Sequence, residues 1–240
     1  MRLPGSWRLR LILMLVVLTL GIVGTAGLSI LHVSQPHPEH FAAGVLSGGT
    51  ALEEALATPV ARRYLRDFRT QETLSSCGPS SVLIVLASLG DPIPNESTLF
   101  EGEPWQRLRM RLLGMSLDDV AALLHERGVG RVEVLRDLPY EAFLSTLSRC
   151  NDLNNRCIVN FDRAPIFGVS VGHFSPIAGY EPGDNLVTLL DVTPGFGPTL
   201  IPSELLHAGV QTKDSETGQS RGLLIVSEIA KNPDAPAGRE

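Results

Sequence analysis

The sequence predicts an α+β domain, with helices in its first half and antiparallel strands in its second half, behind an apolar N-terminal segment. Residues 51–69 and 77–90 carry apolar side chains at helical spacing. From residue 132 onward, short runs rich in apolar and β-branched residues alternate with turn-forming residues. The 240 residues are 43% hydrophobic and 19% charged, which is enough apolar material for one compact domain of about 200 residues.

Residues 1–31 are predicted to be a membrane anchor or signal segment. Three arginines precede residues 11–31, an uncharged run long enough to span a bilayer, which takes about 20 helical residues. Because these arginines lie only before the run, the positive-inside rule places the following domain outside the cytoplasm. We therefore expect an inner-membrane anchor with a periplasmic domain. Gly24-Thr25-Ala26 also fits a cleavage site, so secretion to the periplasm stays open.

The rest of the chain divides by composition into a linker at residues 32–49, a catalytic domain at residues 50–230 and a tail at residues 231–240. Helices are predicted at residues 51–69, 77–90, 116–128, 140–150 and 202–208. Strands are predicted at residues 132–134, 157–161, 173–180, 186–192 and 222–226. The third and fourth of these strands flank a turn, so we expect them to form a hairpin.

Charge and cysteine content limit the partners. The net charge is −6 and no basic stretch follows the N-terminal segment, which argues against nucleic acid. Cys77, Cys150 and Cys157 are the three cysteines, and an odd number outside the cytoplasm suggests one pair and one free thiol. Cys150 and Cys157 bracket a polar loop that a disulfide can close, but two separate buried thiols fit equally well. No Cys/His spacing is typical of a metal site.

Four residues occur in the order that a cysteine acyl-transfer site requires. Cys77 lies six residues after Gln71, at a predicted helix start whose free N–H groups favour a thiolate. His173 and Asp191 lie at the outer ends of the predicted hairpin, where the right register brings them side by side. Cys77 then acts as nucleophile and His173 as base, with Asp191 orienting the imidazole and Gln71 stabilising the oxyanion. Each residue alone has an ordinary structural interpretation; their combination favours catalysis.

Longer motifs around these residues resemble the catalytic core of phytochelatin synthases. The matching segments are Gln71…Cys77-Gly78, Val159-Asn160-Phe161-Asp162-Arg163, Gly172-His173-Phe174-Ser175-Pro176, Leu190-Asp191-Val192 and residues 214–222. The Gly-His-Phe-Ser-Pro run and the Val-Asn-x-x-Arg run are the most specific of these. The resemblance implies a papain-like cysteine protease fold, with the nucleophile helix in the first half and the sheet in the second.

The resemblance also implies a reaction and a substrate. Family members attack glutathione, release glycine and form a γ-glutamylcysteinyl thioester, which passes to a second glutathione in phytochelatin synthesis and metal detoxification, or to water. Asn160, Arg163, Arg221 and Gly172 are expected to hold the γ-glutamyl end of the substrate. No resident cofactor or metal is expected, although divalent heavy metals can stimulate the reaction as glutathione thiolate complexes. A homodimer is compatible with these expectations, but neither the motifs nor the resemblance decide the oligomeric state.

Two departures from the family pattern modify these expectations. Pro194 stands three residues after Asp191, where family members usually have an arginine, and this weakens the case for glutathione recognition. The sequence also lacks the Cys-rich C-terminal region of the plant enzymes. It is similar to the short bacterial members, so we expect hydrolysis to γ-Glu-Cys to be favoured over transfer.

Two other functions remain open at this point. One is a papain-like peptidase of different specificity, such as those that cut leader peptides after Gly-Gly; there the histidine is usually followed by apolar residues. The other is a non-enzymatic thiol- or metal-binding module outside the cytoplasm, which has no need for all four residues. The sequence does not decide between water and a thiol peptide as acceptor, nor does it give metal dependence or oligomeric state.

Overall fold

The computed structural model describes residues 10, 12–22, 36–37 and 39–229, and the chain divides into two units, Met1–His37 and Pro38–Glu240. In the first unit, residues 12–22 are helical. No helix among the described residues has the length and hydropathy needed to cross a membrane. The predicted span at residues 11–31 lies partly outside the described residues, and the predicted tail at residues 231–240 lies wholly outside them. Both stay predictions.

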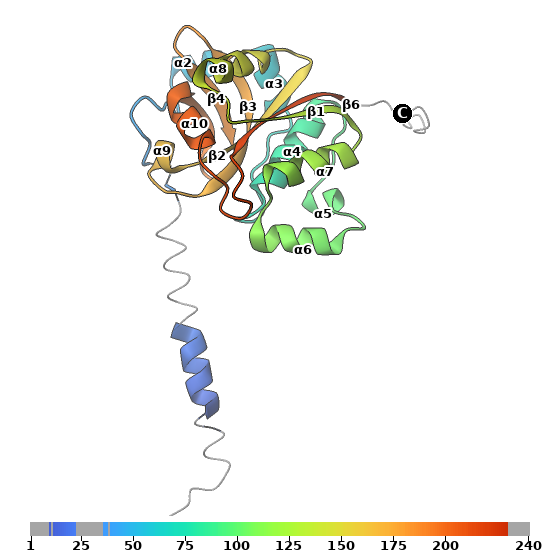
Figure 1. The fold of residues 1–240 in the computed structure, drawn as a ribbon, viewed down its shortest axis with the longest axis vertical. Coiled ribbons are helices and arrows are strands. Elements are labelled where there is room, and N and C mark those ends of the chain that lie inside the picture. Colours follow the sequence, from blue (N-terminus) through green and yellow to red (C-terminus); the bar gives the residue numbers. More distant parts are fainter. Residues whose placement is uncertain (1–9, 11, 23–35, 38, 230–240) are drawn as a thin grey trace, which may run out of the picture. The chain divides into compact units, whose positions relative to one another are not determined.

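Helices dominate the first half of the second unit (Figure 1). They are α2 (Thr50–Leu56), α3 (Pro59–Leu65), α4 (Cys77–Ser88), α5 (Glu96–Leu99), α6 (Pro104–Leu113) and α7 (Leu117–Glu126). The single helix predicted at residues 51–69 is wrong, because the chain breaks it before Pro59. Thr58 caps the new helix by accepting a hydrogen bond from Ala61 N–H, and proline suits the first helical turn but cannot continue a helix.

The second half forms one six-stranded antiparallel sheet with the order β1-β6-β2-β3-β4-β5. Its strands are β1 (Val129–Arg136), β2 (Asn155–Asp162), β3 (Gly172–Glu181), β4 (Leu186–Asp191), β5 (Gly197–Pro202) and β6 (Gly222–Ile229). Helices α8 (Tyr140–Arg149), α9 (Ala164–Phe167) and α10 (Ser203–Val210) complete the domain. The predicted hairpin is β3–β4. The edge strand β5 was missed, since glycine and proline at its ends look like turn residues.

Helix α4 is the centre of the core. All of its residues are buried, and it packs on β3. Side chains alternate along each strand, so Ile158 and Leu224 face α4 and α7, while Val159 and Leu223 face α8 and α10. Helices thus cover both faces of the sheet. Cys77 is the first residue of α4, the helix whose residues are all buried. The predicted α+β layout, with the helix that begins at Cys77 packed on an antiparallel sheet, is confirmed.

A disulfide joins Cys150, at the end of α8, to Cys157 in β2, with their Cα atoms 5.7 Å apart. This settles the alternative that the sequence left open. Cys77 is left as the free thiol.

Candidate active site

Cys77 is the first residue of α4 and lies close to His173. The loop before it is closed locally, because Thr73 N–H donates to Ser76 Oγ at 2.9 Å. Cys77 is buried, and its thiol lies near enough to the His173 side chain and the backbone of Phe174 for both to lower its pKa. The helix that begins at Cys77, α4, therefore lies against β3, the strand that contains His173, as predicted.

A register shift in the β3–β4 hairpin brings His173 and Asp191 onto the same face of the sheet. The pairing shifts by one residue between Ile177 and Gly179, so β3 contains one extra residue at this point. Because successive side chains alternate between faces, the unshifted register would place His173 and Asp191 on opposite faces. The bulge is thus a requirement for their contact.

His173 and Asp191 make a direct buried contact. His173 Nε2 lies 3.1 Å from Asp191 Oδ1, and Thr193 N–H donates to the same oxygen at 2.8 Å. Since Nε2 faces the carboxylate, Nδ1 is the ring nitrogen that meets the Cys77 thiol. The edge of His173 also packs on Phe161, with ring centroids 5.8 Å apart. These contacts fix the imidazole between the thiol and the carboxylate.

The electrostatic environment favours a thiolate and an imidazolium. Burial acts to raise the pKa of Cys77, but the hydrogen bond and charge of His173, Phe174 N–H and the charge of Arg163 together hold this pKa below its ordinary value. Burial and Arg163 act to lower the pKa of His173, yet Asp191 raises it overall. Burial opposes ionisation of Asp191, but His173 and Arg163 hold its pKa well below the usual range. The lowered pKa of Cys77 and the raised pKa of His173 both act in the direction that activates a cysteine nucleophile.

Gln71 is anchored beside the end of β4. Its N–H donates to the carbonyl of Val192, the residue after Asp191, at 2.7 Å. Its side chain is buried, and Oε1 has no hydrogen-bond partner among the described residues. The same loop is tied to α4 by Glu96, which sequence reasoning missed: its Oε1 accepts Glu72 N–H at 3.3 Å and the Ser80 hydroxyl at 3.2 Å.

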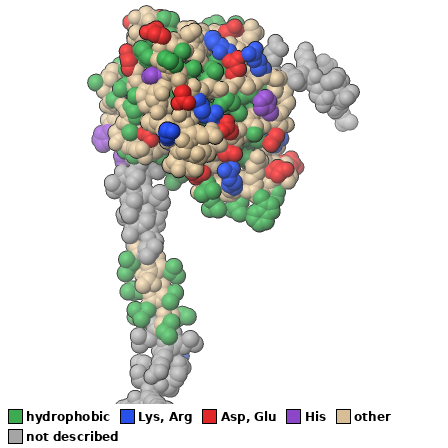
Figure 2. All heavy atoms as spheres, viewed as in Figure 1, with side chains coloured by type: hydrophobic (Ala, Val, Ile, Leu, Met, Phe, Trp, Pro, Cys, Tyr) green, Lys and Arg blue, Asp and Glu red, His purple; other side chains and the backbone are tan. Residues whose placement is uncertain are grey.

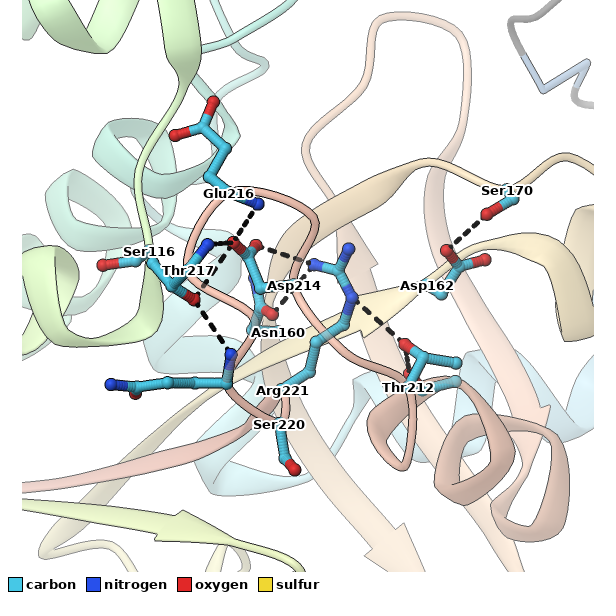
Figure 3. A network of polar contacts seen from close by, with 12 residues as sticks. Ser116, Asn160, Asp162, Ser170, Thr212, Asp214, Glu216, Thr217, Ser220 and Arg221 are labelled. Atoms are coloured by element: carbon cyan, nitrogen blue, oxygen red, sulfur yellow. Dashed lines mark hydrogen bonds and ion pairs between the residues drawn. The ribbon is translucent and has the colours of Figure 1, made fainter.

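A second polar group surrounds Arg221 at the start of β6 (Figure 3). Arg221 Nη1 donates to Asn160 Oδ1 at 3.1 Å and lies 3.4 Å from Asp214 Oδ2, while Nε donates to Thr212 Oγ1 at 3.1 Å. Asn160 in β2 pairs with Phe174 in β3, so this polar group lies beside the strand that contains His173. Three of the predicted substrate-binding residues, Asn160, Arg221 and Gly172, are brought together here.

Gly172 is needed for this arrangement. A Cβ atom at this position would lie 2.5 Å from Arg221 Nη1. Only glycine therefore lets the guanidinium lie against the backbone next to His173.

Asp214 belongs to the same group and was given no role from the sequence. Its Oδ1 accepts hydrogen bonds from the N–H groups of Glu216 and Thr217, both at 3.0 Å, and from the Thr217 hydroxyl at 3.2 Å. Its Oδ2 is left to face Arg221. The Asp-x-x-Thr-Gly pattern at residues 214–218 is typical of such a turn and is the signal that could have identified it.

Arg163 lies elsewhere than expected. Its Nη2 contacts Asp191 Oδ2, the carboxylate oxygen that His173 does not use. The guanidinium carbon lies 4.6 Å from the Phe167 ring centroid and 4.7 Å from the Phe196 ring centroid, and the two rings pack edge to face with their centroids 5.3 Å apart. The side chain is thus engaged with the triad carboxylate and two rings, rather than with the Arg221 group. Pro194 lies in the exposed turn that leads from Asp191 to Phe196, and it supplies no charge there.

Known proteins of one family are similar in sequence to this chain. The family model described as phytochelatin synthase matches residues 38–223. Glutathione gamma-glutamylcysteinyltransferase 3 of Lotus japonicus is 30% identical over 69% of this chain and 37% of its own length. Glutathione gamma-glutamylcysteinyltransferase 1 of Triticum aestivum is 31% identical over 69% of this chain and 35% of its own length. The chain thus spans little more than a third of these relatives.

A more distant relative and one solved structure are also similar. The glutathione gamma-glutamylcysteinyltransferase of Schizosaccharomyces pombe is 24% identical over 67% of this chain and 41% of its own length. The crystal structure of the peptidase domain of Streptococcus ComA, a bifunctional ABC transporter involved in quorum sensing, covers 67% of this chain and 96% of its own. Its TM-score is 0.45 at 18% identity, a likeness too loose to support an argument.

Proposed function

Because the chain belongs to the phytochelatin synthase family, we propose that it is a glutathione γ-glutamylcysteinyltransferase-like enzyme that cleaves the bond between cysteine and glycine in glutathione. The observation that carries this proposal is the buried Cys77–His173–Asp191 assembly beside the Arg221 group. The first supplies nucleophile, base and orienting carboxylate. The second supplies charges for the amino-acid end of a γ-glutamyl substrate.

In the first step, the Cys77 thiolate attacks the carbonyl carbon of the cysteinyl residue of glutathione. The carbonyl oxygen becomes an oxyanion, which Cys77 N–H at the helix start and the Gln71 amide stabilise. The His173 imidazolium then donates its proton to the glycine nitrogen as the carbon–nitrogen bond breaks. Glycine leaves, and a γ-glutamylcysteinyl thioester remains on Cys77.

In the second step, water or the amino group of a second glutathione attacks the thioester. His173 takes the proton from the attacking group, and the thiolate of Cys77 leaves. Water gives γ-Glu-Cys, and glutathione gives an elongated thiol peptide. We favour hydrolysis, because the chain resembles the short bacterial members of the family.

The Arg221 group suits the γ-glutamyl end of glutathione, which carries a carboxylate and an ammonium on one carbon. Arg221 can bind the carboxylate through charge-assisted hydrogen bonds, and Asp214 can accept from the ammonium. Asn160 holds the guanidinium in place. Arg163 is given a different function: it is a positioning residue that holds Asp191 and adds positive charge near the thiolate.

Location and metal dependence are further parts of this proposal. A domain outside the cytoplasm, held by residues 11–31 or released, fits the Cys150–Cys157 disulfide, since disulfides persist in oxidising compartments. Heavy-metal ions would enter as glutathione thiolate complexes, that is, as part of the substrate. No group of three or more His, Cys, Asp or Glu side chains among the described residues is arranged to hold a metal ion.

The test is mass spectrometry of the products that the purified full-length chain makes from glutathione, Cys-Gly dipeptide and a Gly-Gly leader peptide, with glycine release measured for the first two. We expect release from glutathione, none from the dipeptide, and loss of activity in Cys77→Ser and His173→Ala. A Cys150→Ser/Cys157→Ser variant is the control, because it removes the other cysteines without touching the site. Equal turnover of the dipeptide, or cleavage of the leader peptide alone, would replace the glutathione assignment with a peptidase.

A further inference from the structure

Glu96, the first residue of α5, is a buried acid that the proposed reaction does not use. Acidic side chains are scattered over the visible face of the domain in Figure 2, but Glu96 is 1% exposed. Its Oε1 accepts hydrogen bonds from a backbone N–H and a hydroxyl, and its Oε2 has no hydrogen-bond partner among the described residues. Burying a carboxyl group costs free energy that uncharged donors offset only in part, so its value to the protein lies in what these bonds hold together.

The bonds of Glu96 join the two segments that carry the candidate oxyanion donors. We call residues 71–76, which lead into α4, the Gln71 loop. Glu96 Oε1 accepts the N–H of Glu72 in this loop at 3.3 Å. The same oxygen accepts the Ser80 hydroxyl at 3.2 Å, and Ser80 lies about one turn after the start of α4. One carboxylate oxygen thereby connects the loop to the helix.

Two further hydrogen bonds hold the backbone around Gln71, whereas its side-chain oxygen has none. Gln71 N–H donates to the carbonyl of Val192 at 2.7 Å. Just before the loop, Arg69 Nη1 donates to the carbonyl of Pro94 at 2.8 Å, in the segment that leads to α5. Gln71 Oε1 is buried and has no hydrogen-bond partner among the described residues. The direction of the Gln71 amide therefore depends on the backbone that these bonds and Glu96 hold.

We propose that Glu96 is a positioning residue for the oxyanion: it holds the Gln71 loop against α4, so that the Gln71 amide and Cys77 N–H face the same point. The two donors come from different segments, and Glu96 Oε1 is bonded to both segments. Donors stabilise an oxyanion only when they are already aimed at it, and a displacement of about 1 Å can cost roughly 100-fold in rate. The inference rests on the proposed acyl transfer to Cys77, but not on glutathione as the acyl donor.

Two small reagents separate stabilisation of the oxyanion from formation of the thiolate. p-Nitrophenyl acetate acylates a thiolate through a tetrahedral oxyanion and releases nitrophenolate, whereas iodoacetamide alkylates it by losing iodide and forms no oxyanion. Both reactions need the Cys77 thiolate, which His173 and Arg163 favour. In the full-length chain, Glu96→Ala should therefore slow acylation of Cys77 roughly 10- to 100-fold and leave alkylation unchanged. Mass spectrometry of the intact chain against time measures both rates.

Three further variants show whether Glu96 acts through Gln71. Glu96→Gln should restore most of the acylation rate, because its amide oxygen can accept the same two hydrogen bonds. Gln71→Ala should slow acylation about as much as Glu96→Ala, and combining the two should cost little more, since no amide is then left to position. Leu147→Ala is the matched control: it removes buried side-chain atoms of α8, far along the chain from the loop, and should lower stability without changing either rate.

The outcomes for Glu96 and for the glutathione assignment can be told apart. If the ester acylates Cys77 but glutathione yields no glycine, the substrate assignment fails and the acylation rates still decide the role of Glu96. If Glu96→Ala does not fold, Ser80→Ala decides it, because this variant removes one of the two bonds and should slow acylation severalfold without affecting alkylation. Unchanged acylation, an equal loss of acylation and alkylation, or losses that multiply in the double variant would overturn the proposal.

Discussion

Arg163 and Arg221 are both almost completely buried, at 3% and 4% exposed, and both lie at the same end of the sheet, yet their surroundings differ. The guanidinium of Arg163 packs against two aromatic rings, Phe167 and Phe196, and has one carboxylate partner, Asp191. Arg221 is surrounded by polar side chains and the bare backbone of Gly172.

The difference shows how neighbours assign different functions to two chemically identical residues. Burial against two aromatic rings keeps water away from the Arg163 guanidinium, so its charge is committed to Asp191 and, through it, to His173. The partners of Arg221 can rearrange around an incoming carboxylate, because several of them share the guanidinium. Arg163 is therefore expected to control the triad, and Arg221 the substrate.

Arg163→Met should have the largest effect. Removing one partner of a buried ion pair destabilises a fold by about 3–5 kcal/mol, so the free energy of unfolding in urea should fall strongly. Loss of the positive charge should also raise the pKa of Cys77, so the rate of thiol alkylation should rise at higher pH than in the wild type. Arg66→Met is the control, since it removes an exposed ion pair with Asp67 and should cost about 1 kcal/mol or less. A variant with normal stability and a raised KM alone would make Arg163 a substrate clamp instead.

Arg221→Ala should affect the substrate rather than the thiol. Losing one hydrogen bond to a charged group costs about 1.5–3 kcal/mol, or roughly one to two powers of ten in kcat/KM for glutathione. The pH dependence of Cys77 alkylation should stay that of the wild type. Glycine release against glutathione concentration and alkylation against pH measure the two effects. If alkylation shifts while KM is unchanged, the two arginines do not have the separate roles assigned to them.

Gly172→Ala should have a smaller effect of the same kind. The new methyl group must displace the end of the Arg221 side chain, and a side chain held off its preferred rotamer costs about 1 kcal/mol. That corresponds to roughly a fivefold rise in KM for glutathione. Gly48→Ala is the control, because no atom lies within 4 Å of its added Cβ. Unchanged kinetics in Gly172→Ala would mean that the position of Arg221 does not matter for binding.

The pH dependence of stability should be the smallest effect. Because the pKa of Cys77 is lower in the folded protein than in the unfolded chain, its thiolate stabilises the fold, and this stability is lost as pH falls through the folded-state pKa. Because the pKa of His173 is higher in the folded protein, its imidazolium stabilises the fold, and this stability is lost as pH rises through the folded-state pKa. Relative to a Cys77→Ser/His173→Ala variant, the wild type should therefore be most stable between these two pKa values. Urea unfolding across a pH series measures this difference. A difference that changes steadily in one direction would rule out a coupled thiolate and imidazolium.

The sequence was sufficient for the parts of the site that depend on local motifs. Cys77 at a helix start and His173 and Asp191 on a hairpin follow from spacing and composition. The register that brings His173 and Asp191 into their predicted contact could not be derived from the sequence, because it depends on a one-residue bulge that shifts the pairing of every residue beyond it. The partners of Arg163 could not be derived from the sequence either. Its carboxylate partner Asp191 and the Phe196 ring lie far from it along the chain, and only the packing of α9 against the turn after β4 brings them together.

The central claim is that Cys77 carries a γ-glutamylcysteinyl group during turnover, and rapid-quench mass spectrometry of the full-length protein mixed with glutathione tests it most directly. We expect an adduct of that mass on the peptide that contains Cys77, forming together with a burst of glycine. Arg221→Ala should need more glutathione to form it, whereas Arg163→Met should form it slowly even at saturating glutathione. Glycine release without an adduct on Cys77, or an adduct that persists in Cys77→Ser, would contradict the account.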